Sequence, residues 1–147
     1  MDAAGLTVSH SPARARYFSL DEADRTIPLV RRIVRDIRDE YRDLQQPLRR
    51  LREFEQQEAP GEVDQLRRDI DRRSRRLNGF LDELIALGCH FKDFDLGLVD
   101  FFSRLDGRPV HLCWKLGEPR IAWWHEIDAG FAGRRPIAPE QRELFQP

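Results

Sequence analysis

The residues best suited to chemistry lie in the last third of the chain, where apolar and polar positions alternate. They carry carboxylate, imidazole, thiol and amine groups beside a large aromatic ring. They are Asp100, His111, Cys113, Lys115, Trp124 and Glu126. Nitrogen, sulfur and oxygen ligands of this kind bind zinc or iron. The candidate metal ligands are His111, Cys113, Glu126 and Asp100. Their spacing matches no diagnostic metal motif, so the strands would have to bring them together.

The same groups also allow acid–base catalysis. Two carboxylates and an imidazole could act as general acid and base, with Lys115 holding an anion and Trp124 stacking on a flat substrate. The chain has no GxSxG, Walker, GxGxxG or HExxH motif. A purely structural alternative is a cross-strand pair between His111 and Glu126, with Cys113 packed as a small apolar group.

Strands are the elements that must position these residues. Period-two alternation predicts three strands, and a further edge strand would extend the sheet to four. The strands are expected at 98–105, 109–116 and 120–127, with the edge strand at 90–94. Turn residues separate the three strands, so the sheet is expected to be an antiparallel meander.

Two tight turns set the expected register of this meander. A turn at 106–107 places Asp100 opposite Cys113, and a turn at 118–119 places Cys113 opposite Trp124. The candidate residues then share one polar-aromatic face, and the other face is almost wholly apolar. The apolar face is expected to carry Val99, Phe101, Val110, Leu112, Trp114, Ile121 and Trp123, with His125 at its end. A slip of one residue would exchange the two faces of a strand.

Two long amphipathic helices precede the strands. Heptad spacing predicts one apolar seam on each. The seams are Ile27, Val30, Val34, Ile37, Tyr41, Leu44, Leu48 and Leu51, then Val63, Leu66, Ile70, Arg73, Leu77, Phe80, Leu84 and Leu87. Ser19 and Glu22 have the form of a capping box, the segment Ala59–Gly61 breaks the first helix, and Gly88 suits a C-cap. A short turn at 20–26 is expected to bend into the main helix near Pro28. Arg73 is expected to snorkel. The alternatives are a pair with a buried acid, a device that sets the helix register, or a contact with a partner.

These patterns predict an α+β protein, in which a long, coiled-coil-like antiparallel helical hairpin packs on a small three- to four-stranded antiparallel sheet. A chain of 147 residues is suited to one domain. We expect a flexible arm at 1–18 and a single domain at 19–147. The domain divides into the hairpin at 19–88, the sheet at 89–128 and an irregular tail at 129–147.

Charge and cysteine content exclude several classes of function. The chain has 25 Lys+Arg against 26 Asp+Glu, and nearby acids match the arginines of the second helix. A nucleic-acid partner is therefore not expected, because phosphate binding needs uncompensated positive charge. No apolar run approaches the length of a membrane span, so no membrane partner is expected. The two cysteines form no CxxC motif, which favours a cytoplasmic protein with reduced thiols.

Several segments together resemble a known family. They are Phe18–Ala23, Ile27–Val30, Phe91–Phe94, Gly97–Phe101, Leu112–Glu118 and Trp124–Arg134, in this order. From about Phe18 to Pro136 the chain is similar to the bacterial family known as domain of unknown function 2203. The resemblance supports the fold and a bacterial cytoplasmic setting, and it implies no activity and no site residues.

The function expected from the sequence is binding. We expect a homo-oligomeric binding or interaction module, a homodimer through the helical hairpin, with a polar-aromatic ligand site on the sheet. The alternative is a metal-dependent or acid–base enzyme that uses the same sheet face.

Overall fold

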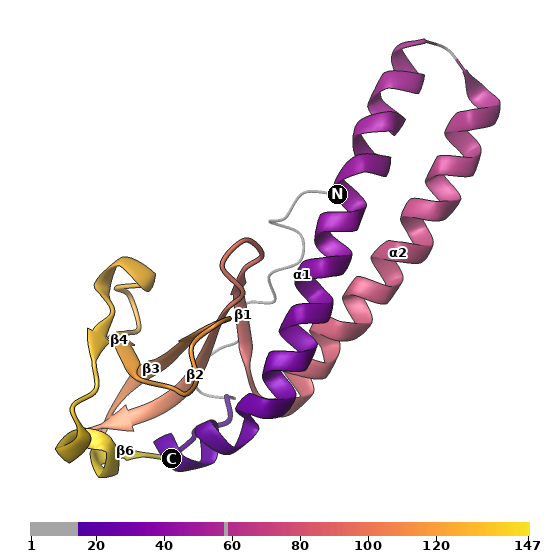
Figure 1. Cartoon of the computed structure of the whole chain (residues 1–147). Helices are drawn as coiled ribbons and strands as arrows, with labels where there is room; N and C mark the ends of the chain where they lie inside the picture. The colour runs from indigo at the N-terminus through magenta and orange to yellow at the C-terminus, as the bar shows by residue number, and fades with distance from the viewer. Residues whose placement is uncertain (1–14, 58) are drawn as a thin grey trace.

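A two-helix hairpin and an antiparallel sheet lie side by side in the computed structural model, which describes residues 15–57 and 59–147 (Figure 1). Helix α1 spans Leu20–Gln56 and helix α2 spans Pro60–Leu87. The predicted α+β class, with a long hairpin on a small antiparallel sheet, is confirmed. Most of the predicted arm lies outside the described residues, but its last residue, Phe18, is fully buried.

Local signals set the ends of both helices. The Ser19 side chain accepts a hydrogen bond from the Glu22 backbone N–H at 3.1 Å and caps α1. Helix α1 runs on through Pro28 and Pro47, so the expected separate turn at 20–26 is wrong. Helix α2 begins at Pro60 and ends before Gly88, whose φ of 89° is the left-handed conformation of a C-cap.

The two predicted seams are most deeply buried in the part of the hairpin near the sheet. In α1 the last buried residue is Leu44, and the helix continues to Gln56 with partly or fully exposed side chains. Arg73 pairs with the buried carboxylate of Glu40, with Nη1 3.7 Å from Oε1. The Arg73 side chain is also 40% exposed, so the pairing with a buried acid occurs together with the expected snorkelling. None of the described helices is long and apolar enough to cross a membrane.

Within the described ranges, the sheet has four main strands and two very short ones. They are β1 (His90–Asp93), β2 (Leu98–Leu105), β3 (Arg108–Lys115), β4 (Trp123–Glu126), β5 (Arg135–Pro136) and β6 (Phe145–Gln146). The order is β1-β2-β3-β4-β5, with β6 paired to β2. The tail expected to be irregular thus supplies two strands, and it also forms 3-10 helices at Phe131–Gly133 and Pro139–Leu144. Two-residue strands are too short to produce a period in the sequence.

The register between β2 and β3 is the predicted one. Asp106 and Gly107 have φ values of 53° and 81°, as a tight hairpin turn with two left-handed residues requires. Asp100 therefore pairs with Cys113, and Phe102 pairs with His111.

The predicted register between β3 and β4 is wrong by one residue. Cys113 pairs with Trp123 and not with Trp124, and His111 pairs with His125 and not with Glu126. The cause is the connection at 116–122, where the backbone N–H of the fully buried Ile121 donates to Asp24 of α1 at 2.8 Å. This contact takes Ile121 out of the expected strand, and every side chain of β4 changes face.

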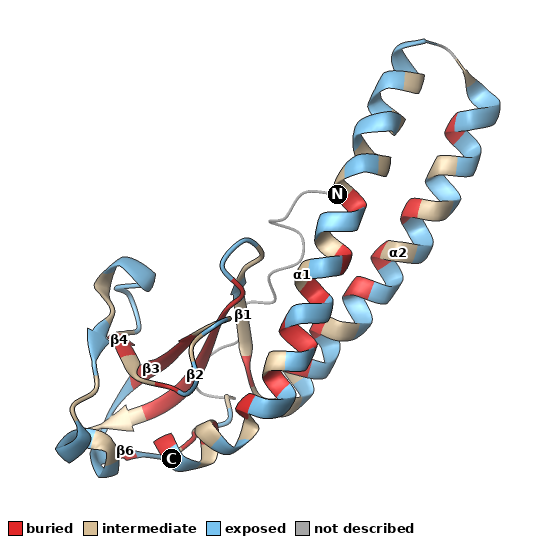
Figure 2. Ribbon diagram, in the orientation of Figure 1, coloured by how far each residue is buried: buried red, intermediate tan, exposed pale blue. Residues whose placement is uncertain are grey.

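A single apolar core joins the hairpin to the sheet (Figure 2). Val99, Phe101, Val110, Leu112 and Trp114 of the sheet are fully buried, as predicted for the apolar face. The rings of Phe18 and Phe101 pack nearly at right angles, with centroids 5.3 Å apart. The other face of these strands carries the polar candidates, so the core holds the site rigidly from behind.

Candidate metal centre

Three potential metal ligands meet on the polar face of the sheet. Asp100 of β2, Cys113 of β3 and His125 of β4 each offer one ligand atom, and these atoms all lie within 4.8 Å of one another. The three residues are 3%, 0% and 2% exposed. The strands are adjacent and in register, so their backbone pairing fixes the relative positions of the three side chains.

The ring of His125 is oriented by two hydrogen-bonding contacts. Its Nδ1 lies 2.7 Å from the backbone carbonyl oxygen of Glu126, and its Nε2 lies 3.1 and 3.2 Å from the two Asp100 oxygens. A carbonyl oxygen only accepts, so Nδ1 carries a hydrogen and donates. Nε2 can therefore interact favourably with the Asp100 carboxylate in two ways. It can carry a proton and donate a hydrogen bond, or both groups can bind a cation held between them.

With no ion bound, protons satisfy this cluster. Burial lowers the pKa of His125, but its hydrogen bond to Asp100 and the negative charge of that carboxylate outweigh burial, so the pKa is raised. Burial, together with the Asp100 charge, raises the pKa of the Cys113 thiol to about 12. These shifts favour a protonated His125 ring and a neutral Cys113 thiol beside Asp100.

His111 is the fourth polar residue of this face. It is 5% exposed, and its Nδ1 lies 3.9 Å from an Asp100 oxygen, beyond hydrogen-bond distance. Among the residues that the structure describes, Nδ1 has no hydrogen-bond partner. Burial, reinforced by the charge of His125, lowers the pKa of His111 to about 4 despite the nearby Asp100 carboxylate, so the ring is neutral.

Aromatic rings and one arginine enclose the cluster. Phe102 lies against the His111 ring, with centroids 4.5 Å apart. Arg134 covers the Trp123 ring at 4.8 Å and is held by both carboxylate oxygens of Glu118, at 2.7 and 2.9 Å. It also donates to the Cys113 carbonyl oxygen at 3.4 Å. A dry shell of this kind strengthens electrostatic interactions inside it.

The structure brings together only part of the predicted set. Asp100, His111 and Cys113 are neighbours as expected, and Lys115 lies partly exposed at the end of β3. Trp124 and Glu126 lie on the opposite face of β4, because of the shifted register. Trp124 packs near Phe145, with ring centroids 6.0 Å apart. Glu126 pairs with Arg108 at 2.8 Å and cannot join the metal set from that side.

His125 is the residue of this cluster that sequence reasoning missed. The predicted register placed it at the end of an otherwise apolar face. A single histidine in line with valine, leucine and tryptophan side chains was the available sign that the register was shifted.

The chemistry of the cluster suits a transition metal. A tetrahedral ion bound to carboxylate, imidazole and thiolate holds its ligand atoms roughly 3.3–3.8 Å apart. The Asp100 to His125 distances of 3.1 and 3.2 Å are close to that spacing. The His125 Nδ1–H bond to a backbone carbonyl is the outer contact that orients most metal-binding histidines.

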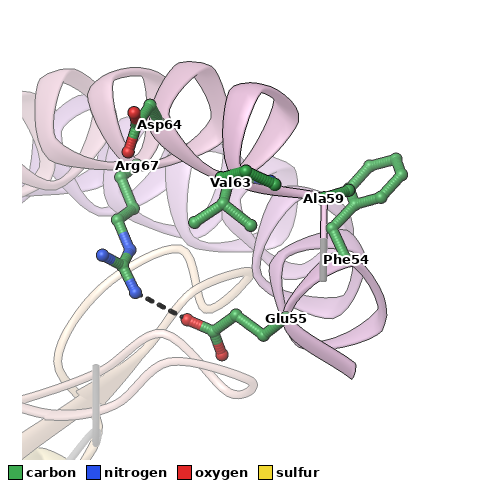
Figure 3. Close-up of a pocket in the computed structure, with 7 residues that line it drawn as sticks. Phe54, Glu55, Ala59, Val63, Asp64 and Arg67 are labelled. Atoms are coloured by element: carbon green, nitrogen blue, oxygen red, sulfur yellow. Dashed lines mark hydrogen bonds and ion pairs between the residues drawn. The ribbon is translucent and has the colours of Figure 1, made fainter. Parts of the chain in front are cut away.

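A separate pocket lies at the far end of the hairpin (Figure 3). It has a volume of about 410 Å³ and is lined by Phe54, Glu55, Ala59, Pro60, Val63, Asp64 and Arg67. Figure 3 shows Arg67 reaching to Glu55, and the two form an ion pair at 2.8 Å. Both partners are largely exposed, so the pair adds little stability.

Comparison with known proteins agrees with the resemblance seen in the sequence. A family model described as "Uncharacterized conserved protein (DUF2203)" matches residues 16–137. No curated protein and no solved structure matches the chain.

Proposed function

This chain belongs to the DUF2203 family, and because that membership names no activity we propose from its geometry that it is a transition-metal-binding module. One observation carries the proposal. The ligand atoms of Asp100, Cys113 and His125 lie within 4.8 Å of one another. The remaining nitrogen of His125 is already committed to a backbone carbonyl, which leaves Nε2 for the ion.

Binding is favoured over catalysis by the burial of the cluster. A catalytic zinc keeps one coordination position open to substrate, whereas a structural zinc is closed by protein ligands. Asp100, Cys113 and His125 are each at most 3% exposed, which supports a closed site. A metal-dependent enzyme that uses the same residues is therefore only the second candidate. A bacterial cytoplasm, where the Cys113 thiol stays reduced, is part of the proposal.

The metal content of the purified protein tests this function. Protein prepared without chelator should contain close to one zinc or iron ion per chain, measured by elemental analysis. Chelator-treated protein should bind one Zn²⁺ in calorimetric titration. The variant Cys113→Ser should lose about 100-fold or more in affinity. Cys89→Ser is the matched control, because Cys89 is the other buried cysteine and lies outside the cluster. A wild-type protein that binds no metal ion would refute the proposal.

A second pair of variants distinguishes the two registers of β4. His125→Gln should lower zinc affinity about 100-fold, because it removes a ligand. Glu126→Gln should leave the affinity unchanged, since Glu126 faces Arg108 on the other side of the strand. Equal losses from both variants would contradict the assignment of His125.

We also propose that the protein is a homodimer through the outer half of its hairpin. This half stands clear of the sheet (Figure 1), and Leu48 and Leu51 of its seam are only partly buried. Its two helices have opposite charge. Residues 45–56 contain three arginines and two glutamates, whereas residues 60–71 contain four acids and two arginines. An antiparallel second copy would place α1 of one chain on α2 of the other.

Size-exclusion chromatography with light scattering tests the dimer. Wild-type protein should have twice the mass of the chain, and Leu48→Glu should reduce it to one chain. Leu29→Glu is the control, since Leu29 is exposed on the part of α1 that packs beside the sheet. A concentration-independent monomer mass for wild-type protein would exclude this part of the proposal and would leave metal binding unaffected.

A further inference from the structure

We infer that His111 is the fourth ligand of the bound ion, which makes the site a closed, four-coordinate zinc site with one thiolate, two imidazoles and one carboxylate. The inference rests on the proposed function and specifies its ligand class. It also assigns the ion a structural role, because no coordination position then remains for substrate.

The first observation is the unsatisfied ring nitrogen of His111. Buried polar groups almost always have a partner, and an exception requires a physical reason. His111 Nδ1 is buried and, within the described part of the chain, has no hydrogen-bond partner. A metal ion can be that partner, because an imidazole nitrogen that carries no hydrogen binds a metal ion through its lone pair.

The second observation is the convergence of two imidazoles on one carboxylate. His111 Nδ1 and His125 Nε2 lie 3.9 and 3.1 Å from Asp100 oxygens, and the two imidazole rings are 5.1 Å apart. The distance from His111 is too long for a hydrogen bond and close to the ligand spacing of a tetrahedral zinc ion, roughly 3.3–3.8 Å. A cation at the centre would give each of these groups a partner.

The third observation is the position of His111 on its strand. His111 and Cys113 are two residues apart on β3, so both side chains point to the same face. Asp100 and His125 come from the strands on either side. The four ligands therefore come from three neighbouring strands, and the ion would tie β4 to β2 through β3.

A different result is expected if the cluster holds only protons and binds no metal ion. Protons on Cys113 and His125 satisfy those two residues and Asp100, but they leave the His111 nitrogen without a partner. In that case His111 is a packing residue, and replacing it with another ligating residue would leave the metal chemistry unchanged.

Cobalt substitution in the full-length protein separates these possibilities. Co²⁺ bound to one thiolate gives a charge-transfer absorption band whose intensity scales with the number of thiolates. Wild-type protein should show this band, and Cys113→Ser should lose it. His111→Cys should about double the intensity per bound cobalt, because a second thiolate replaces the imidazole. His111→Gln should lower zinc affinity about 100-fold.

His90 provides the matched control. It is the histidine of β1 that pairs with Asp100 across the strands, and its ring packs on Phe102. His90→Cys should leave the intensity at the wild-type value. Circular dichroism checks that each variant is folded, and the gain of intensity in His111→Cys does not depend on a loss of stability.

The outcomes distinguish the two levels of the proposal. Wild-type protein that gives the cobalt band, together with an unchanged intensity in His111→Cys and an unchanged affinity in His111→Gln, would overturn the role of His111 and leave metal binding intact. Wild-type protein that binds neither Co²⁺ nor Zn²⁺ would overturn the proposed function itself. If the intensity of the cobalt band doubled in His90→Cys as well, a thiolate at either position would reach the ion. That result would overturn the specific assignment of His111 as the fourth ligand.

Discussion

The carboxylate of Asp100 lies between two imidazoles and close to a thiol, in a part of the sheet from which water is almost excluded. In such an environment a charge is tolerated only when an opposite charge or a hydrogen bond accompanies it. Protons on His125 and Cys113 provide that compensation when no ion is bound. A divalent ion would compete with those protons for the same nitrogen and sulfur atoms.

Cys89, the cysteine outside the cluster, allows a prediction at the scale of one residue that does not depend on the metal site. Burial raises the pKa of Cys89 from 9.0 to about 12, despite the charge of Arg16. Because the pKa is higher in the folded chain, the thiol contributes stability below about pH 9 that is lost as the pH rises towards 12. The free energy of unfolding should therefore fall more steeply with pH in wild-type protein than in Cys89→Ala.

The expected difference in slope is about 1.4 kcal/mol per pH unit above pH ~9. Urea denaturation of both proteins between about pH 8 and about pH 11 measures it. Cys113 is present in both proteins, so its contribution cancels. Parallel pH profiles would show that the Cys89 thiol is not held in its neutral form by the fold.

At the scale of elements, the turn before β2 joins the sheet to helix α1. Gly97 has a φ of 63°, and a Cβ at this position would lie 2.7 Å from Leu116 and 3.0 Å from Val34 of α1. Only glycine allows both this conformation and this close approach. Gly107, in the turn between β2 and β3, has a φ of 81° but nothing within 4 Å of its Cβ position.

This contrast predicts different costs for two alanine substitutions. Gly107→Ala should destabilise the protein by about 1–2 kcal/mol, from backbone conformation alone. Gly97→Ala should cost a further ~1–3 kcal/mol, because the Leu116 and Val34 side chains must also move. Urea denaturation gives both values, and equal losses would mean that the turn before β2 is not packed against α1.

At the scale of the whole molecule, the hairpin and the sheet share one core, so they should unfold together. The ligands of the candidate site come from β2, β3 and β4, whose other faces are part of that core. Metal binding should therefore stabilise the entire domain and not only the site.

Thermal unfolding measures this coupling. Zinc at 100 times its dissociation constant should add about 2.7 kcal/mol of stability, because it binds only the folded chain. For a domain of this size the increase corresponds to a rise in Tm of roughly 5–10 °C. Cys113→Ser should show no such rise at the same zinc concentration. An unchanged Tm in wild-type protein would contradict the proposed site.

Much of the fold follows from local patterns. The heptad seams, Ser19 and Gly88 define two helices, and the alternation after Gly88 defines the main strands. The turn at Asp106 and Gly107 determines the pairing of Asp100 with Cys113. The short strands of the tail could not be predicted in this way, because two-residue pairings depend on which distant strand is near.

What the sequence by itself determined was the two helices, the main strands and three residues of the candidate site, Asp100, His111 and Cys113, since periodicity, caps and tight turns act between near neighbours. Only the tertiary structure decided which face of β4 carries its imidazole. That choice depends on Ile121, which is buried in the shared core and hydrogen-bonded to Asp24, far away in sequence. The contact shifts the strand by one residue, so His125 replaces Glu126 beside Asp100 and Cys113.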